Sequence, residues 1–124
     1  MKRVVITGMG VISPIAKDIT TYWNSLQNGV LGISEITSIP TDELVVKIAG
    51  EVKDFKPEDF GVDKDMARRA DLFTQYAMAA AQQAMTDSKL SVNPERLGVY
   101  IGSGIGGIKT FHNEIGRASC RERV

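Results

Sequence analysis

Two glycine-rich segments are the first candidates for chemistry in this chain, because each follows a run of apolar residues. Thr7-Gly8-Met9-Gly10 begins like a dinucleotide-binding loop, but the third glycine is missing where Ser13-Pro14 intervenes. Residues 102–107 satisfy the complete G-x-G-x-x-G spacing. Such loops bring backbone N–H groups close to phosphates at the start of a helix. A nucleotide-binding module is therefore one hypothesis; we favour the other, in which the glycines permit tight turns and close packing of chains.

The one cysteine and the one histidine both lie close to the C-terminal end of the chain. A lone cysteine can be a catalytic nucleophile, but Cys120 belongs to the last ten residues, which look foreign to the protein. We interpret His112, beside Asn113, as a solvated surface residue. The sequence therefore predicts no catalytic residue, no metal ligand, no disulfide and no cofactor within this chain.

The last ten residues, Ile115 to Val124, resemble a sequencing artefact. They can be back-translated into codons that resemble the reverse complement of a widely used sequencing adapter, whose preceding bases would complete the codon of Glu114. Such a segment carries no information about the fold of the native protein. We therefore expect residues 1–113 to be the start of a truncated gene product and residues 114–124 to be a non-native read-through tail. A natural basic tail is the alternative.

Composition limits the classes of partner. The whole chain carries 15 basic and 15 acidic side chains, and 12 and 14 remain without its last ten residues. Neither balance creates the basic field that attracts nucleic acid or a membrane surface. The apolar run after Met1-Lys2-Arg3 is interrupted by glycines and lacks a cleavage site, so a signal peptide is not expected. We expect a soluble, cytoplasmic protein of at most one domain, with no nucleic-acid and no membrane partner.

Strand patterns precede both glycine-rich segments. Residues 3–7 and 97–101 are short, nearly uninterrupted apolar runs rich in β-branched residues, which is typical of strands buried on both faces. Residues 45–52 alternate loosely and predict another strand, whereas residues 34–40 have an irregular pattern. Asn93-Pro94 predicts a turn before the last strand.

Helical patterns separate these strands. Asp18 or Thr20 can cap a first helix, and Gly29 stands where a left-handed residue commonly ends one. The strongest helical pattern runs from about Asp65 to Ser88 and predicts a mostly buried helix. The order strand, helix, strand, helix, strand predicts an α/β domain with parallel strands.

Several blocks of residues together cover nearly all of residues 1–107. They are Arg3-Val4-Val5-Ile6-Thr7-Gly8-Met9-Gly10-Val11-Ile12-Ser13-Pro14, Trp23, Gly29, Gly32-Ile33, Lys47-Ile48-Ala49-Gly50, Asp54-Phe55, Ala70-Asp71-Leu72-Phe73-Thr74-Gln75-Tyr76-Ala77, Ala84-Met85-Thr86-Asp87-Ser88 and Val99-Tyr100-Ile101-Gly102-Ser103-Gly104-Ile105-Gly106-Gly107. In this order the blocks resemble the β-ketoacyl-acyl carrier protein synthase family of condensing enzymes. The resemblance is far more specific than either glycine-rich segment alone, and it accommodates the Ser13-Pro14 that a nucleotide-binding loop does not.

The resemblance implies a thiolase-like fold of two α/β halves, of which this chain would hold the first part of the N-terminal half, with an incomplete sheet. Family members elongate fatty acids: they move an acyl group from acyl carrier protein to a cysteine and condense it with malonyl-acyl carrier protein as carbon dioxide leaves. The family's catalytic cysteine and two histidines lie downstream of the glycine-rich loop and cannot be placed here. The resemblance therefore implies an inactive fragment of a condensing acyltransferase whose parent is a homodimer.

Two secondary roles can be carried over, because the matching positions are present. Ile105 matches a residue that lines the acyl-chain pocket, and ordinary core packing is its alternative. Lys64, Arg68 and Arg69 match a basic cluster that receives the acidic acyl carrier protein. Cations near the start of a helix are disfavoured by the helix dipole, so these arginines call for a partner such as Asp63, Asp65 or an external anion. A solvated charged face is the alternative.

The isolated chain is expected to be poorly stable. Its strands would lack their sheet neighbours, so edges and apolar helix faces would be exposed. An interaction fragment without chemistry stays open as a further alternative. The acyl-chain preference cannot be predicted from these residues.

Overall fold

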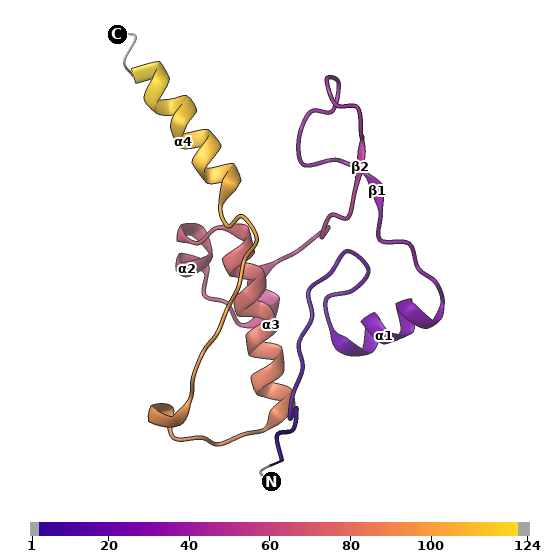
Figure 1. Cartoon of the computed structure of the whole chain (residues 1–124), viewed down its shortest axis with the longest axis vertical. Coiled ribbons are helices and arrows are strands. Elements are labelled where there is room, and N and C mark those ends of the chain that lie inside the picture. The colour runs from indigo at the N-terminus through magenta and orange to yellow at the C-terminus, as the bar shows by residue number, and fades with distance from the viewer. Residues whose placement is uncertain (1–2, 122–124) are drawn as a thin grey trace.

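The computed structural model describes residues 3–121, which form an open arrangement of short elements rather than a layered domain (Figure 1). Helix α3 lies near the centre, α4 projects beyond one end of it, and α1 lies with a small hairpin on the other side. No helix among these residues is long and apolar enough to cross a membrane. In chain order the elements are α1 (Ile19–Gln27), β1 (Ser34–Glu35), β2 (Ile48–Ala49), the 3₁₀ turn η1 (Pro57–Phe60), α2 (Lys64–Arg69), α3 (Leu72–Ser88), the 3₁₀ turn η2 (Pro94–Arg96) and α4 (Ile108–Arg121).

Helix α1 follows its local sequence signals. The Asp18 carboxylate accepts a hydrogen bond from the Thr21 amide at 2.9 Å, which caps the helix and lowers the pKa of Asp18. Gly29 follows the helix with φ of +62°, the left-handed conformation that glycine adopts without steric cost. Both the predicted cap and the predicted end of this helix are confirmed.

The long helix predicted from Asp65 to Ser88 is two helices in the structure. Ala70 is extended, with φ of −97° and ψ of 138°, so α2 ends at Arg69 and α3 begins at Leu72. The Gln75 side-chain amide bridges the break by donating to the carbonyls of Ala67 (2.8 Å) and Ala70 (2.9 Å). The prediction of one continuous helix was wrong because these two carbonyls have a side-chain donor in place of the next helical turn.

The first glycine-rich segment packs directly on α3. A Cβ atom at Gly8 or at Gly10 would overlap a backbone carbonyl oxygen of that helix, that of Ala84 or that of Ala80. Gln83 fastens the same segment: its side-chain oxygen accepts from the Val11 amide at 3.2 Å, and its amide donates to the Lys17 carbonyl at 2.8 Å. The interpretation of these glycines as residues for close packing is therefore confirmed.

The predicted parallel strands do not form within this chain. Residues 3–7 and 97–101 belong to no ladder, and Val4 and Tyr100 are 96% and 98% exposed instead of buried on both faces. The one named ladder among the described residues is antiparallel and pairs β1 with β2, which lie in segments predicted as irregular and as a strand. A strand needs a neighbour for its backbone hydrogen bonds, and neither run has one here.

The β1–β2 hairpin is held by a carboxylate. Glu51 accepts hydrogen bonds from the amide (2.9 Å) and hydroxyl (2.8 Å) of Thr37 and from the Ser38 amide (3.1 Å). Hydrogen bonds from Ser38 and Thr37 lower the pKa of Glu51 to about 2. This clamp fixes the two ends of a loop that carries no other regular structure.

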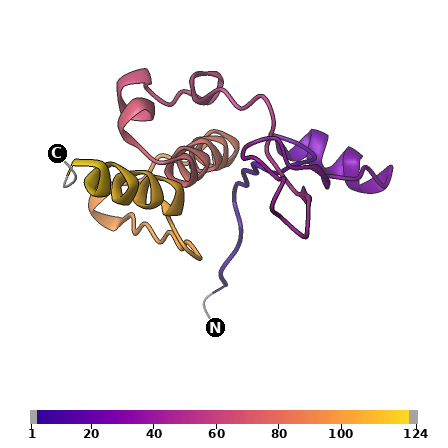
Figure 2. The same cartoon turned by 90° about the horizontal axis from the view of Figure 1, so that it is seen from above.

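The interior of the chain is small. Its accessible surface is 10648 Å², whereas a folded monomer of 13.5 kDa exposes about 6,500 Å². Among residues 3–116 the buried side chains are Ala16, Ser25, Val62 and Ala79. Seen from above, the N-terminal segment extends away from the remaining elements (Figure 2). The chain thus shows the exposed apolar surface that its incomplete sheet predicts.

Candidate functional site

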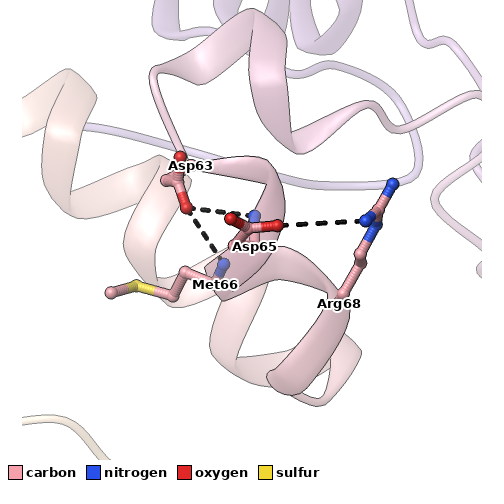
Figure 3. Close-up of polar contacts among 4 residues, drawn as sticks. All are labelled: Asp63, Asp65, Met66 and Arg68. Atoms are coloured by element: carbon pink, nitrogen blue, oxygen red, sulfur yellow. Dashed lines mark hydrogen bonds and ion pairs between the residues drawn. The ribbon is translucent and has the colours of Figure 1, made fainter.

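The basic cluster lies on α2, a six-residue helix fixed at its start by Asp63. One carboxylate oxygen of Asp63 accepts hydrogen bonds from the amides of Asp65 (3.0 Å) and Met66 (3.1 Å), as Figure 3 shows. Capping of this kind satisfies amides that have no partner within the helix. The cap sets where the helix begins and therefore where its basic side chains stand.

Arg68 and Arg69 lie in the last turn of α2 and not near the start of a long helix. Cations at the C-terminal end of a helix interact favourably with its dipole. The expectation that the dipole disfavours these arginines was wrong, because it assumed that α2 and α3 were continuous. Their position therefore supplies no separate argument for an external anion.

Arg68 has an acidic neighbour in the same helix. Its guanidinium Nη1 lies 3.9 Å from the Asp65 carboxylate, and the two side chains are 80% and 79% exposed. An ion pair this exposed contributes at most about 1 kcal/mol, so the charge of Arg68 stays available to a partner (Figure 3). Lys64 and Arg68 line an open depression of about 330 Å³, which Glu58 and Gln75 also border.

The second glycine-rich segment turns sharply ahead of α4. The Ser103 hydroxyl accepts a hydrogen bond from the Gly106 amide at 2.9 Å, and Gly106 has φ of +73°. Ile105 lies at this turn and is 76% exposed. The Ile105 side chain is therefore not enclosed by a pocket among the described residues. Its role at an acyl-chain pocket stays a prediction.

A carboxylate occupies the place where a nucleotide phosphate would approach this segment. Asp71 accepts a hydrogen bond from the Thr110 hydroxyl, and its carboxylate lies so close to Gly107 that a Cβ there would overlap it. A negative charge at the start of α4 repels a phosphate. The nucleotide-binding alternative thus receives no support. His112 is exposed, in agreement with its interpretation as a surface residue.

Asp71, Gln75 and Gln83 are structural residues that the sequence analysis did not single out. All three join segments that are separated along the chain. The residue type of Asp71 could have indicated a helix boundary, because aspartate is more favourable at an N-cap than in the interior of a helix. No comparable signal marks the two glutamines among the other polar residues of α3.

The structure describes residues 114–121 of the predicted tail. Helix α4 runs from Ile108 to Arg121 and so crosses the predicted boundary between Asn113 and Glu114. Helix formation does not depend on the origin of a segment, so a non-native tail stays a prediction. Residues 122–124 lie outside the described part of the chain.

Comparisons with known proteins identify the class. Residues 1–122 match the family described as "Beta-ketoacyl synthase, N-terminal domain". The chain is 53% identical over 113 residues to 3-oxoacyl-[acyl-carrier-protein] synthase 2 of Staphylococcus aureus (strain COL), covering 89% of this chain and 27% of that protein. It is 41% identical over 116 residues to the enzyme of the same name from Synechocystis sp., covering 91% and 28%.

A solved structure gives the same class. The structure titled "The ishigamide ketosynthase/chain length factor" superposes with a TM-score of 0.73 at 30% identity, covering 93% of this chain and 30% of that one. The fold is therefore part of a ketosynthase, a thiolase-like α/β protein. The chain belongs to the β-ketoacyl synthase family and spans about a quarter of the length of the curated relatives it matches.

Proposed function

We propose that this chain is the opening part of a 3-oxoacyl-acyl carrier protein synthase, an acyltransferase that condenses acyl thioesters with malonyl-acyl carrier protein in fatty acid elongation. The 53% identity over 113 residues to the Staphylococcus aureus synthase carries the proposal. The chain supplies neither the reacting cysteine nor the two histidines of the family. Residues 1–113 would thus contribute scaffold and binding surface, and the isolated chain would have no condensing activity.

The exposed cations of α2 are the candidate surface for acyl carrier protein. Lys64, Arg68 and Arg69 are all exposed, and their helix is fixed by the Asp63 cap. An acidic partner protein would be attracted by these charges, since the Asp65 carboxylate neutralises Arg68 only weakly. In the assembled enzyme, Ile105 would lie at the acyl-chain pocket.

A graft tests the proposed function. Residues 1–113 would replace the aligned segment of the S. aureus synthase, and 3-oxoacyl product formed from acyl-acyl carrier protein and malonyl-acyl carrier protein would be measured. We expect the hybrid to condense these substrates and the 124-residue chain alone to form no product. A hybrid that shows the relative's circular dichroism and melting transition but forms no product would contradict the proposal.

Charge reversal in the same hybrid tests the carrier surface. Arg68→Glu and Arg69→Glu should each weaken carrier-protein binding on the order of tenfold, which corresponds to about 1.4 kcal/mol. Lys47→Glu is the matched control, because Lys47 is equally exposed but lies beside the β1–β2 hairpin. Equal binding by all three variants would remove the assignment of this surface.

The assembly and location of the parent are further parts of the proposal. We infer a cytoplasmic homodimer from the family resemblance. Light scattering on the hybrid would give the molar mass, and a monomer at working concentration would contradict the dimer.

A further inference from the structure

Asp71 occupies the N-cap position of α3 but does not cap that helix. Its backbone is extended, with φ of −61° and ψ of 155°, as a capping residue requires, yet its side chain makes no capping hydrogen bond to α3. Aspartate is among the most favoured residues at this position because its carboxylate normally accepts from the amides of the first turn. The carboxylate of Asp71 is therefore committed elsewhere.

The Asp71 carboxylate instead contacts the start of α4. The Thr110 hydroxyl donates to Asp71 Oδ1, and Asp71 Oδ2 is the atom nearest to where a Cβ of Gly107 would stand. Gly107 immediately precedes α4, and its carbonyl accepts the first helical hydrogen bond, from the Phe111 amide at 3.0 Å. The carboxylate thus lies within the first turn of a helix that follows it by more than thirty residues.

Helix α4 lacks the charge that Asp71 brings. Its first turn contains no acidic residue, although negative charge is favourable at the positive end of a helix. Gly107 leaves room for the carboxylate, because any larger residue would occupy the same space. Three observations therefore agree with this contact: the first turn of α4 has no acidic residue, Gly107 has no side chain, and the Asp71 carboxylate does not cap α3.

The contact joins two regions that are far apart along the chain. Asp71 follows Arg69 by two residues, so it stands directly after the basic helix α2. On the other side of the contact, Gly107 and Gly106, which lies near the Phe73 ring, end the loop that carries Ile105. A shift of the α2–α3 junction would therefore be transmitted to this loop through the Asp71 carboxylate, with Phe73 as a second, apolar contact.

We propose that Asp71 is a positioning residue that holds the start of α4 from another helix, through the Thr110 hydroxyl, and so ties the Ile105 loop to the junction next to the basic helix α2. The tether itself stands on the contacts of this chain. Its consequence is that the basic helix α2 and Ile105 keep a fixed position relative to each other, and this consequence rests on the proposed function.

Amide hydrogen exchange on the 124-residue chain tests the tether. Asp71→Ala and Thr110→Val should each speed exchange at residues 111–113, the first hydrogen-bonded amides of α4, about tenfold or more, the loss expected of one charge-assisted hydrogen bond. The double variant should exchange no faster than either single variant, because both remove the same bond. Additive effects, equal rates in wild type and Asp71→Ala, or wild-type amides without protection at residues 111–113 would each overturn the tether.

Conservative and neutral variants separate loss of the Asp71–Thr110 contact from general loss of structure. Thr110→Ser keeps the donor and should restore wild-type exchange, whereas Gly107→Ala should act like Asp71→Ala because the methyl group displaces the carboxylate. Gly104→Ala is the matched control, since a Cβ there meets no described atom within 4 Å. A Gly104→Ala effect as large as that of Gly107→Ala would overturn the role assigned to the carboxylate.

The consequence is tested in the hybrid synthase, whose activity without substitution tests the proposed function separately. Asp71→Ala should change the ratio of kcat/KM for a long relative to a short acyl-acyl carrier protein by about threefold or more while leaving carrier binding unchanged. An unchanged ratio in an active hybrid would overturn the link to the Ile105 loop, and an inactive unsubstituted hybrid would count against the proposed function and not the tether.

Discussion

The two glycine-rich segments have similar sequences but different surroundings. Around residues 8–11 the backbone lies against α3 and is fastened by the Asp87 carboxylate, which accepts from the Met9 amide at 3.0 Å, and by Gln83. Around residues 102–105, Gly102 and Gly104 have no described atom within 4 Å of a Cβ position. An apolar run followed by glycines therefore indicates a close approach in one case and an open loop in the other. The difference comes from the partner that each segment has within this chain.

The largest expected effect breaks the packed segment. Gly10→Ala should lower the free energy of unfolding by about 1–3 kcal/mol, because the new Cβ would meet the Ala80 carbonyl oxygen, a backbone atom that cannot move alone. Urea unfolding followed by circular dichroism would measure the change. Gly104→Ala is the control and should change the value by less than about 0.5 kcal/mol. Equal losses in both variants would remove the distinction between the two segments.

A second substitution removes the polar fastening without adding volume. Gln83→Ala leaves the Val11 amide and the Lys17 carbonyl without this side chain and should cost about 1–2 kcal/mol. Gln82→Ala, at the exposed neighbouring position, should cost much less. The same unfolding measurement applies, and comparable losses for the two glutamines would show that the amide does not hold the segment.

The β1–β2 hairpin should loosen at low pH. The folded pKa of Glu51 is about 2 and its ordinary value is 4.5, so the carboxylate stabilises the clamp above pH 4.5 and its contribution is lost as the pH falls toward 2. The protection factors of the Thr37 and Ser38 amides, which correct for the intrinsic pH dependence of exchange, should therefore fall over this range, as NMR would show. Glu51→Gln should abolish the dependence and Glu43→Gln should leave it intact. A transition unchanged by Glu51→Gln would contradict the clamp.

The smallest effect is expected in the exposed runs. Tyr100→Ser removes a side chain that is 98% exposed and should change the free energy of unfolding by less than about 0.5 kcal/mol. It should also reduce binding of an apolar dye, because it removes exposed aromatic surface. A loss above 2 kcal/mol would show that residues 97–101 pack in solution.

The elements predicted well are those whose signals are local. The Asp18 cap, the left-handed Gly29 and the turn at Asn93-Pro94 depend on atoms within a few residues, and the structure has all three. Each of these signals acts through one hydrogen bond or one backbone conformation. Such features persist even where the rest of a fold is missing.

The parallel strands could not be obtained from local signals. An apolar run specifies a preference for burial, but a ladder also needs a second strand in register. Residues 3–7 and 97–101 have the preference and lack the partner within this chain. The break after Arg69 was missed for a related reason, because it depends on Gln75 reaching back to carbonyls five and eight residues earlier.

In the candidate sites too, local features could be predicted from the sequence and tertiary contacts could not. The helical conformation of Arg68 and Arg69 could be predicted, but their place in the last turn of a short helix could not. The contact of Asp71 with α4 joins residues 39 positions apart, and no periodicity connects them. Family resemblance supplied the expected roles, whereas the tertiary contacts came from the structure.

Amide exchange at residues 3–7 and 97–101, compared between the 124-residue chain and the hybrid synthase, tests most directly whether these runs are strands whose partners lie in the remainder of a ketosynthase. If they are, their amides should be nearly unprotected in the isolated chain and protected at least about a thousandfold in the hybrid, as for strands within a stable core. Equal protection in both proteins, or none in an active hybrid, would contradict this assignment.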